Sequence, residues 1–307
     1  MTSALTVIAV PGHGAEDVVV DATGSVYTGT DDGSVFRIRA DGRRIDRVGS
    51  TGGRPLGLEL LPDGRLLVGD AALGLLALDT ATGRVEVLAS QVHGRRMVFC
   101  NNAAVQGSGD IWFSDSSTVF GIERWKADLV EDTHSGRLLR RTPDGAVEVV
   151  LDGLRFANGV ALAADESFVA VAETAGRTVV RRWLSGPLAG GTDHLVTDLP
   201  GYPDNIARGS DGLIWVTIAS PVDAVLERLM GAPRPVRRLA WRLPEVLQPK
   251  PGRTVRVMAF DDDGRTVHDL SADASGYHLV TGVREHEGRV WLGSLEEPGV
   301  AFIDLPA

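Results

Sequence analysis

The sequence predicts an all-β fold: a six-bladed β-propeller formed by a single domain over residues 1–307. Glycine accounts for 37 of the 307 residues, whereas segments with helical periodicity are few. Six segments have the pattern strand, tight turn, strand, which is the short-range signature of a β-hairpin. Three of the five intervals between their turns are 40–46 residues long, the length of one four-stranded propeller blade.

The six hairpins each place a turn residue between two short apolar runs, as in "GLELLPDGRLLVGD" and "NIARGSDGLIWVTI". The turn residues are Gly24, Gly64, Gly109, Glu166, Gly212 and Gly288. The two longer intervals indicate insertions. A β-sandwich is the structural alternative, but it does not explain six similar hairpins.

The last insertion, near residues 220–252, differs in character from the blades and is predicted to be partly helical. Its first part, Val222–Met230, has helix-compatible spacing, and prolines then interrupt the pattern. The insertion is either a lid over one mouth of the propeller or padding on the outer edge of a blade.

Composition limits the partners and the compartment. A net charge of −10 and a pI near 5.2 would repel phosphate backbones, so nucleic acid is not expected as a partner. No apolar run approaches the roughly 20 residues that span a membrane, and the N-terminus lacks the basic region of a signal peptide. The single cysteine, Cys100, has apolar neighbours and fits a reducing compartment. We therefore expect a cytoplasmic protein that acts on a small molecule, and nothing in the sequence specifies an oligomeric state.

Candidate ligands for a metal ion share one position relative to the turns. The residue eight positions before each turn marks the start of an inner strand, and these strands line the central channel of a propeller. These positions hold Glu16, Leu56, Asn101, Asn158, Asp204 and Val280. Four of the six side chains carry oxygen, and Asn205 adds a further amide. An oxygen-only set with two carboxylates suits Ca²⁺, with Mg²⁺ or Mn²⁺ as weaker candidates, and argues against structural zinc.

A second set of acidic residues is expected near the same mouth. Asp70 and Asp115 lie six residues after their turns, so hairpin pairing brings them opposite the first set. Each can anchor a loop, hold a ligand amide or accept a proton, and anchoring is the commoner role for a buried carboxylate. None of the seven histidines falls at either position.

The segments "GAEDVVVD", "FCNNAAV", "RFANGVAL" and "YPDNI" resemble motifs of the calcium-dependent six-bladed propellers. This group includes gluconolactonase (senescence marker protein), diisopropylfluorophosphatase, paraoxonase and the strictosidine synthase-like proteins, and "RLPEVLQPKP" is most similar to the last branch. The resemblance covers nearly the whole chain. It implies a metal shell of Glu16, Asn101, Asn158 and Asp204, with Asn205 added in the paraoxonase pattern, and it implies that Asp204 is the base or nucleophile.

Three departures from the family pattern limit what the resemblance implies. Asn102 replaces an aspartate that, with the residue matching Asp17, serves a second structural calcium in paraoxonase, so a second ion is not expected. The paraoxonase histidine pair falls on Leu56 and Asp70, which removes that mechanism. Thr281 replaces the glutamate of true strictosidine synthase, so the chain is not expected to catalyse amine–aldehyde condensation in that way.

These observations together favour a calcium-dependent hydrolase of a lactone or related ester, with the metal polarising the carbonyl. Asp204, or else Asp70 or Asp115, would accept a proton from the attacking water. Two alternatives stay open: a non-catalytic, metal-stabilised binding propeller, and a non-hydrolytic biosynthetic enzyme such as an isomerase, cyclase or condensing enzyme. Specificity is expected to lie in the mouth loops, residues 87–100, 116–135 and 220–252.

Overall fold

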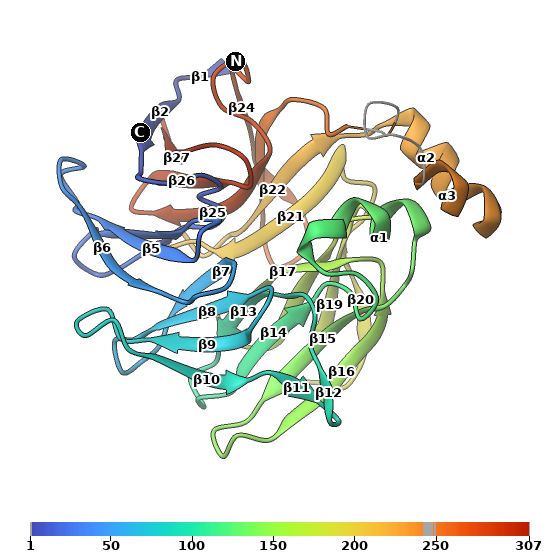
Figure 1. Ribbon diagram of the computed structural model, residues 1–307, viewed down its shortest axis with the longest axis horizontal. Coiled ribbons are helices and arrows are strands. Elements are labelled where there is room, and N and C mark those ends of the chain that lie inside the picture. The colour runs from blue at the N-terminus through green and yellow to red at the C-terminus, as the bar shows by residue number, and fades with distance from the viewer. Residues whose placement is uncertain (1, 242–247, 249, 307) are drawn as a thin grey trace.

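Six antiparallel sheets follow one another around a central axis and form the six blades that the sequence predicts (Figure 1). The computed structural model describes residues 2–241, 248 and 250–306. In every blade the chain runs from the innermost strand outward, so that the six innermost strands surround the channel. The six hairpins predicted from the sequence are the two inner strands of these six blades.

The blades are built from the following strands. The first blade holds β3 (Val19–Val20), β4 (Val26–Gly29), β5 (Ser34–Ile38) and β6 (Ile45–Ser50), and the second holds β7 (Pro55–Leu60), β8 (Leu66–Asp70), β9 (Gly74–Leu78) and β10 (Val85–Ala89). The third holds β13 (Cys100–Val105), β14 (Ile111–Asp115), β15 (Gly136–Arg141) and β16 (Val147–Leu154), and the fourth holds β17 (Ala157–Leu162), β18 (Phe168–Glu173), β19 (Thr178–Trp183) and β20 (Thr192–Val196). The fifth holds β21 (Gly201–Arg208), β22 (Ile214–Pro221), β23 (Val255–Phe260) and β24 (Thr266–Ala272), and the sixth holds β25 (Val280–His286), β26 (Arg289–Ser294) and β27 (Gly299–Asp304).

The N-terminal segment closes the ring. Strand β2 (Thr6–Ala9) pairs antiparallel with β27 and becomes the outermost strand of the sixth blade, while β1 (Thr2–Ser3) pairs in parallel with β24 of the fifth. A short ribbon of β11 (Gln91–Val92) and β12 (Arg95–Arg96) lies between the second and third blades in sequence. Because residues from the start of the chain complete the last blade, the two ends of the chain hold the ring together.

The turns explain the glycine-rich composition. At five of the six inner hairpins the turn glycine has a positive φ, for example +86° at Gly64 and +81° at Gly212, which glycine adopts without the steric cost of a Cβ atom. The remaining turn, the fourth along the chain, holds Glu166 with φ +57°, and β17 and β18 still pair as an antiparallel hairpin. The Glu166 side chain accepts a hydrogen bond from the Gly107 nitrogen at 2.7 Å, which ties this turn to the neighbouring blade.

Neighbouring blades meet so closely near the channel that only glycine fits at several positions. A Cβ atom at Gly159 on β17 would lie 2.0 Å from the Ile206 nitrogen on β21, and one at Gly69 on β8 would lie 2.0 Å from the Asn101 carbonyl oxygen on β13. Further out, apolar side chains fill the space between blades. Trp215, which has no exposed surface, belongs to one of these clusters.

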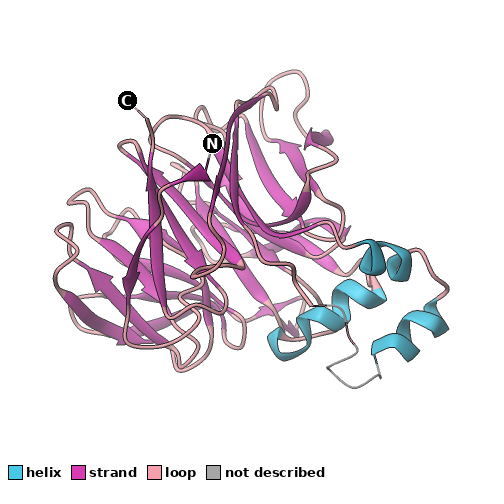
Figure 2. Cartoon of the chain, turned by 90° about the horizontal axis from the view of Figure 1, so that it is seen from above, coloured by secondary structure: helices cyan, strands magenta, loops and turns pink. Residues whose placement is uncertain are grey.

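Three short helices gather at one side of the molecule (Figure 2). Helix α1 (Trp125–Glu131), preceded by a 3₁₀ turn (Ile122–Arg124), lies between β14 and β15, and helices α2 (Ala224–Met230) and α3 (Arg234–Trp241) belong to the insertion predicted near residues 220–252. Asp223 caps α2 by accepting hydrogen bonds from the Val225 and Leu226 nitrogens. Residues 242–247 and 249 of the insertion lie outside the described residues.

The close approach of the inner strands yields a stability prediction. Gly159→Ala should lower the free energy of unfolding by about 3 kcal/mol, at the upper end of overpacking costs, because the new methyl group meets backbone that cannot move independently. Gly276→Ala is the matched control, since a Cβ atom there meets nothing within 4 Å. Chemical denaturation measures both variants. Equal stability of the two would contradict the packing described here.

Candidate functional site

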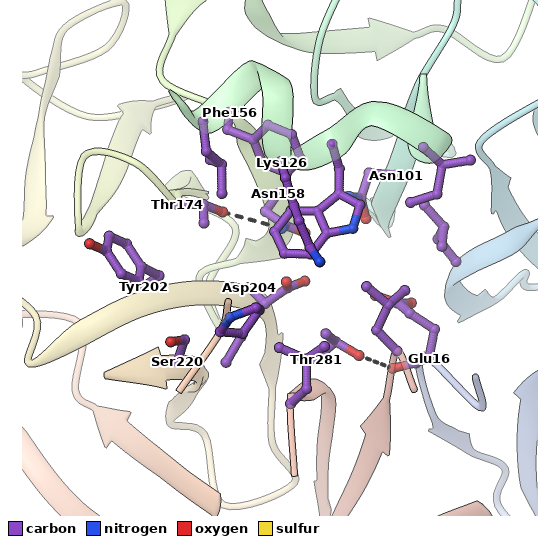
Figure 3. Close-up of a pocket in the computed structure, with 18 of the residues that line it drawn as sticks. Glu16, Asn101, Lys126, Phe156, Asn158, Thr174, Tyr202, Asp204, Ser220 and Thr281 are labelled. Atoms are coloured by element: carbon purple, nitrogen blue, oxygen red, sulfur yellow. Dashed lines mark hydrogen bonds between the residues drawn. The ribbon is translucent and has the colours of Figure 1, made fainter. Parts of the chain in front are cut away.

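A cavity of about 840 Å³, including its open mouth, lies at one end of the channel beneath the helices. Its floor is polar and carries the four predicted metal ligands Glu16, Asn101, Asn158 and Asp204, which reach it from different blades (Figure 3). The offset of eight residues from each turn thus identifies side chains that the fold brings together. Leu56, at the same offset, also lines the cavity.

The amide groups on the floor are oriented by hydrogen bonds from their nitrogen atoms. Asn101 Nδ2 donates to Ser116 Oγ at 2.9 Å, and Asn158 Nδ2 donates to Thr174 Oγ1 at 3.2 Å. The Oδ1 atoms of Asn101 and Asn158 are buried and have no hydrogen-bond partner within the part of the chain that the structure describes. Burial of an oxygen without a hydrogen-bond partner costs free energy, so these two oxygens suit a site that binds a positively charged ligand.

Asn205 and Thr281 hold Glu16 in place. Asn205 Nδ2 donates to Glu16 Oε1 at 3.1 Å, and Thr281 Oγ1 donates to the Glu16 carbonyl oxygen at 2.8 Å. Glu16 Oε2 and Asn205 Oδ1 are also buried without a partner among the described residues. Asn205 does not line the cavity itself, so its nearest role is to brace Glu16.

The acidic groups near the floor are destabilised in their charged form. Burial raises the pKa of Glu16 well above its usual range, the charges of Asp17 and Asp204 add to the rise, and Arg54 opposes it. Burial likewise raises the pKa of Asp204 to about 8; the Asn158 amide opposes this rise and the Asp17 charge adds to it. A divalent cation between the carboxylates would offset this repulsion.

Asn102 and Asp17, which follow Asn101 and Glu16 in the chain, are hydrogen-bonded to each other. Asp17 Oδ2 accepts hydrogen bonds from the Leu58 nitrogen at 2.9 Å and from Asn102 Nδ2 at 3.3 Å, while Asn102 Oδ1 accepts one from the Val160 nitrogen at 3.0 Å. Burial raises the pKa of Asp17 to about 7. These bonds link residues of the first four blades around the channel.

Further along the same inner strands, an ion pair crosses the channel. Arg284 on β25 donates to Glu59 on β7 at 2.8 Å and to the Arg208 carbonyl oxygen on β21 at 3.3 Å. This contact joins the sixth, second and fifth blades. Neither Arg284 nor Glu59 lines the cavity that holds Glu16 and Asp204.

Asp70 and Asp115, the other proton acceptors suggested by the sequence, do not line the cavity. Asp70 Oδ1 accepts hydrogen bonds from the backbone nitrogens of Arg54, Ala72 and Leu73 at 2.9–3.1 Å. Asp115 accepts one from the Phe99 nitrogen and forms an ion pair with Arg137. Both positions favour anchoring of the mouth loops, so among the three suggested residues only Asp204 faces the cavity.

The walls of the cavity are apolar and come from the helices, from the inner strands and from the loops that precede or follow them. They include Leu56, Phe99, Ile122, Trp125, Leu129, Val130, Phe156, Tyr202, Leu226, Leu279 and Leu295. Helix α1 is fixed to the third blade because its buried Asp128 accepts hydrogen bonds from Ser117 Oγ and Thr133 Oγ1. The helical insertion contributes Asp223 and Leu226 to the lining, so its described part borders the cavity.

Several lining residues were not predicted from the sequence. Helix α1 lies in the mouth loop 116–135, but its seven residues are too few to give a clear helical period. Trp125 and Lys126 on this helix and Thr174 on the fourth blade all reach the cavity. A signal was present for Thr174, because it follows Glu173, which lies seven residues after the turn at Glu166.

No group of three or more His, Cys, Asp or Glu side chains placed to hold a metal occurs among the described residues. The floor offers two carboxylates together with amide oxygens instead, a donor set that suits hard cations. No helix within residues 2–241 and 250–306 is long and apolar enough to cross a membrane.

The comparisons with known proteins agree with this architecture. Residues 101–187 match the model of the strictosidine synthase family, and residues 3–38 match that of the strictosidine synthase-like N-terminal region. The adipocyte plasma membrane-associated protein of Salmo salar is 35% identical over 308 residues, which cover 91% of this chain and 73% of the relative. Strictosidine synthase-like protein 10 of Arabidopsis thaliana is 34% identical over 267 residues, which cover 82% of this chain and 70% of the relative.

Solved structures show the same fold at lower sequence identity. A gluconolactonase from Xanthomonas campestris superposes with a TM-score of 0.71 at 17% identity, covering 98% of this chain and 89% of the other. A calcium-binding protein, regucalcin, from Agrobacterium tumefaciens superposes with a TM-score of 0.69 at 14% identity, covering 99% and 95%. The fold, the channel motifs and these relatives together show that the chain belongs to the strictosidine synthase-like family of six-bladed β-propellers.

Proposed function

We propose that the protein is a divalent-cation-dependent hydrolase of a lactone or related ester, and that the cation is Ca²⁺. The observation that carries the proposal is that three lining residues, Glu16, Asn101 and Asn158, each have a buried side-chain oxygen without a hydrogen-bond partner among the described residues. The carboxylate of Asp204 lines the same cavity. The names of two structural neighbours, a gluconolactonase and a calcium-binding regucalcin, are consistent with this reading.

Glu16, Asn101, Asn158 and Asp204 would hold the cation, with Asn205 bracing Glu16. Two carboxylates balance its charge, and the amide oxygens add ligands without further repulsion. When bound, the cation would supply Lewis acidity that polarises a carbonyl group and stabilises a developing oxyanion.

Asp204 would act as the proton acceptor. Water attacks the carbonyl carbon, its proton passes to an Asp204 carboxylate oxygen, the ester C–O bond breaks, and the proton then passes to the leaving alkoxide oxygen. Positive charge nearby would lower the pKa of Asp204 from about 8, so that the group is ionised at neutral pH. The apolar wall around Phe99, Trp125 and Phe156 would hold the organic part of the substrate and exclude bulk water.

The first prediction concerns the cation. Titration calorimetry should detect one Ca²⁺ per chain, and Glu16→Gln or Asn158→Leu should weaken binding at least tenfold because each removes a ligand oxygen or its charge. Asp63→Asn, in an exposed turn of the second blade, is the matched control and should leave binding unchanged. Unaltered Ca²⁺ affinity in both floor variants would contradict the proposed ligand set.

The second prediction concerns catalysis. The protein should hydrolyse members of a panel of γ-lactones, δ-lactones and aryl esters, and EDTA should abolish the activity. Asp204→Ala should reduce kcat by about a hundredfold or more, as expected for loss of a proton acceptor. Asp63→Asn should retain full activity. Hydrolysis that survives both EDTA and Asp204→Ala would refute the mechanism, and inertness toward the panel despite tight Ca²⁺ binding would favour a non-catalytic or non-hydrolytic propeller.

The third prediction concerns pH. Folding raises the pKa of Asp17 to about 7 and of Asp204 to about 8, above the unfolded values near 4, so between these limits the folded, metal-free protein binds more protons than the unfolded chain. The free energy of unfolding in EDTA should therefore fall as the pH rises from 5.5 to 8.5. Asp204→Asn should make this decline shallower, and saturating Ca²⁺ should oppose it. A decline of equal slope in the Asp204→Asn variant would contradict the assignment.

A further inference from the structure

The chain contains two lysines, Lys126 and Lys250, against 29 arginines, and both lysines line the cavity. Elsewhere its side-chain cations are arginines, many of them paired with carboxylates, as in Arg256 with Asp269 and Arg289 with Asp304. Arginine and lysine are not equivalent, since lysine presents a compact point charge on a flexible stem. The concentration of both lysines in one cavity therefore calls for a chemical explanation.

Lys126 is placed by the anchoring of its helix. Asp128 fixes α1 to the third blade, and Asp132, at the end of the helix, pairs with Arg155 at 2.9 Å. The Lys126 Nζ atom lies 5.4 Å from the centre of the Trp125 ring, and its side chain points into the cavity above the floor (Figure 3). The Lys126 side chain is half-buried, so it can contact a bound ligand while it remains part of the cavity wall.

Lys250 reaches the cavity from a different part of the chain, the end of the helical insertion. This segment is tied to β22 because the Gly252 nitrogen donates to Ser220 Oγ at 2.9 Å. Over residues 2–241, 248 and 250–306, neither Lys126 nor Lys250 forms an ion pair with a carboxylate within 4.0 Å. Lys126, half-buried, and Lys250, exposed, thus border one cavity from separate elements. The acidic lining residues are Glu16 and Asp204 on the floor and Asp223 near the mouth.

We propose that Lys126 and Lys250 bind an anionic group of the substrate, so that the site selects amphipathic molecules with an apolar body and a carboxylate or phosphate. The apolar wall accepts the body, and the ammonium groups supply charge-assisted hydrogen bonds to the anion. This local positive charge is needed because the protein as a whole carries a charge of −10, which repels anions. The identity of the reacting ester rests on the proposed function, whereas anion binding can be measured without turnover.

The test uses two probes with the same apolar body, 4-phenylbutyrate and the neutral 4-phenylbutyramide, and measures their binding to the full chain by calorimetry with and without Ca²⁺. The wild type should bind the carboxylate at least about tenfold more tightly than the amide. The double variant Lys126→Gln, Lys250→Gln should reduce this ratio to within about twofold of unity, and Lys126→Arg alone should retain most of it. Phosphonate in place of carboxylate then reports which anion is preferred.

Arg124→Gln is the matched control, because Arg124 is exposed, lies two residues from Lys126 and does not line the cavity. It removes the same charge and should leave the ratio unchanged. The proposal is overturned if the wild type shows no preference, if neither probe binds at millimolar concentration, or if the folded double-lysine variant keeps the preference. A lysine-dependent preference in a protein that hydrolyses no lactone would refute the proposed function while supporting this anion site.

Discussion

The arrangement of polar groups at the centre of this propeller depends on the hydrogen bonds that the buried amide nitrogens donate. Asn101 and Asn158 donate to hydroxyl groups just past the ends of the neighbouring strands β14 and β18, and Asn205 donates to Glu16. A buried amide that satisfies its donors in this way has its oxygen left over, and burial makes an unpaired oxygen costly. The hydrogen bonds of the amide nitrogens thus fix the direction of the amide oxygens. Among the described residues, no donor or cation of the protein pairs with the Asn101 and Asn158 oxygens.

The propeller makes this convergence possible because its inner strands can approach each other without side chains between them. Glycines such as Gly69 and Gly159 allow backbone of one blade to touch backbone of the next, and Asn158, next to Gly159, lines the cavity. The bond between Asp17 and Asn102 and the ion pair between Arg284 and Glu59 then tie distant blades across the channel. A polar floor therefore lies under a wall to which both the blades and the helices contribute.

The sequence was sufficient for the blades and for the position of the floor, because turn glycines and strand alternation repeat with a fixed geometry. The same offset that selects Glu16 and Asp204 also selects Leu56. Hairpin pairing placed Asp70 and Asp115 nearby, but it did not reveal that Asp70 Oδ1 accepts backbone hydrogen bonds or that Asp115 pairs with Arg137. A repeat gives position along a strand, but not the hydrogen-bond partners of a side chain. The wall was not predictable, because α1 is too short for periodicity and depends on tertiary bonds.

The hydrogen bond that Thr281 donates limits the chemistry that the proposed site can perform. Its hydroxyl donates to the Glu16 carbonyl oxygen, so Thr281 supports the backbone of a residue that we propose as a ligand. Among the described lining residues, the ionisable groups on the floor are then Glu16 and Asp204, with Lys126, Lys250 and Asp223 nearer the mouth. Asp223 is held by the first turn of α2. A floor on which Asp204 is the proposed proton acceptor suits attack by water on a polarised carbonyl.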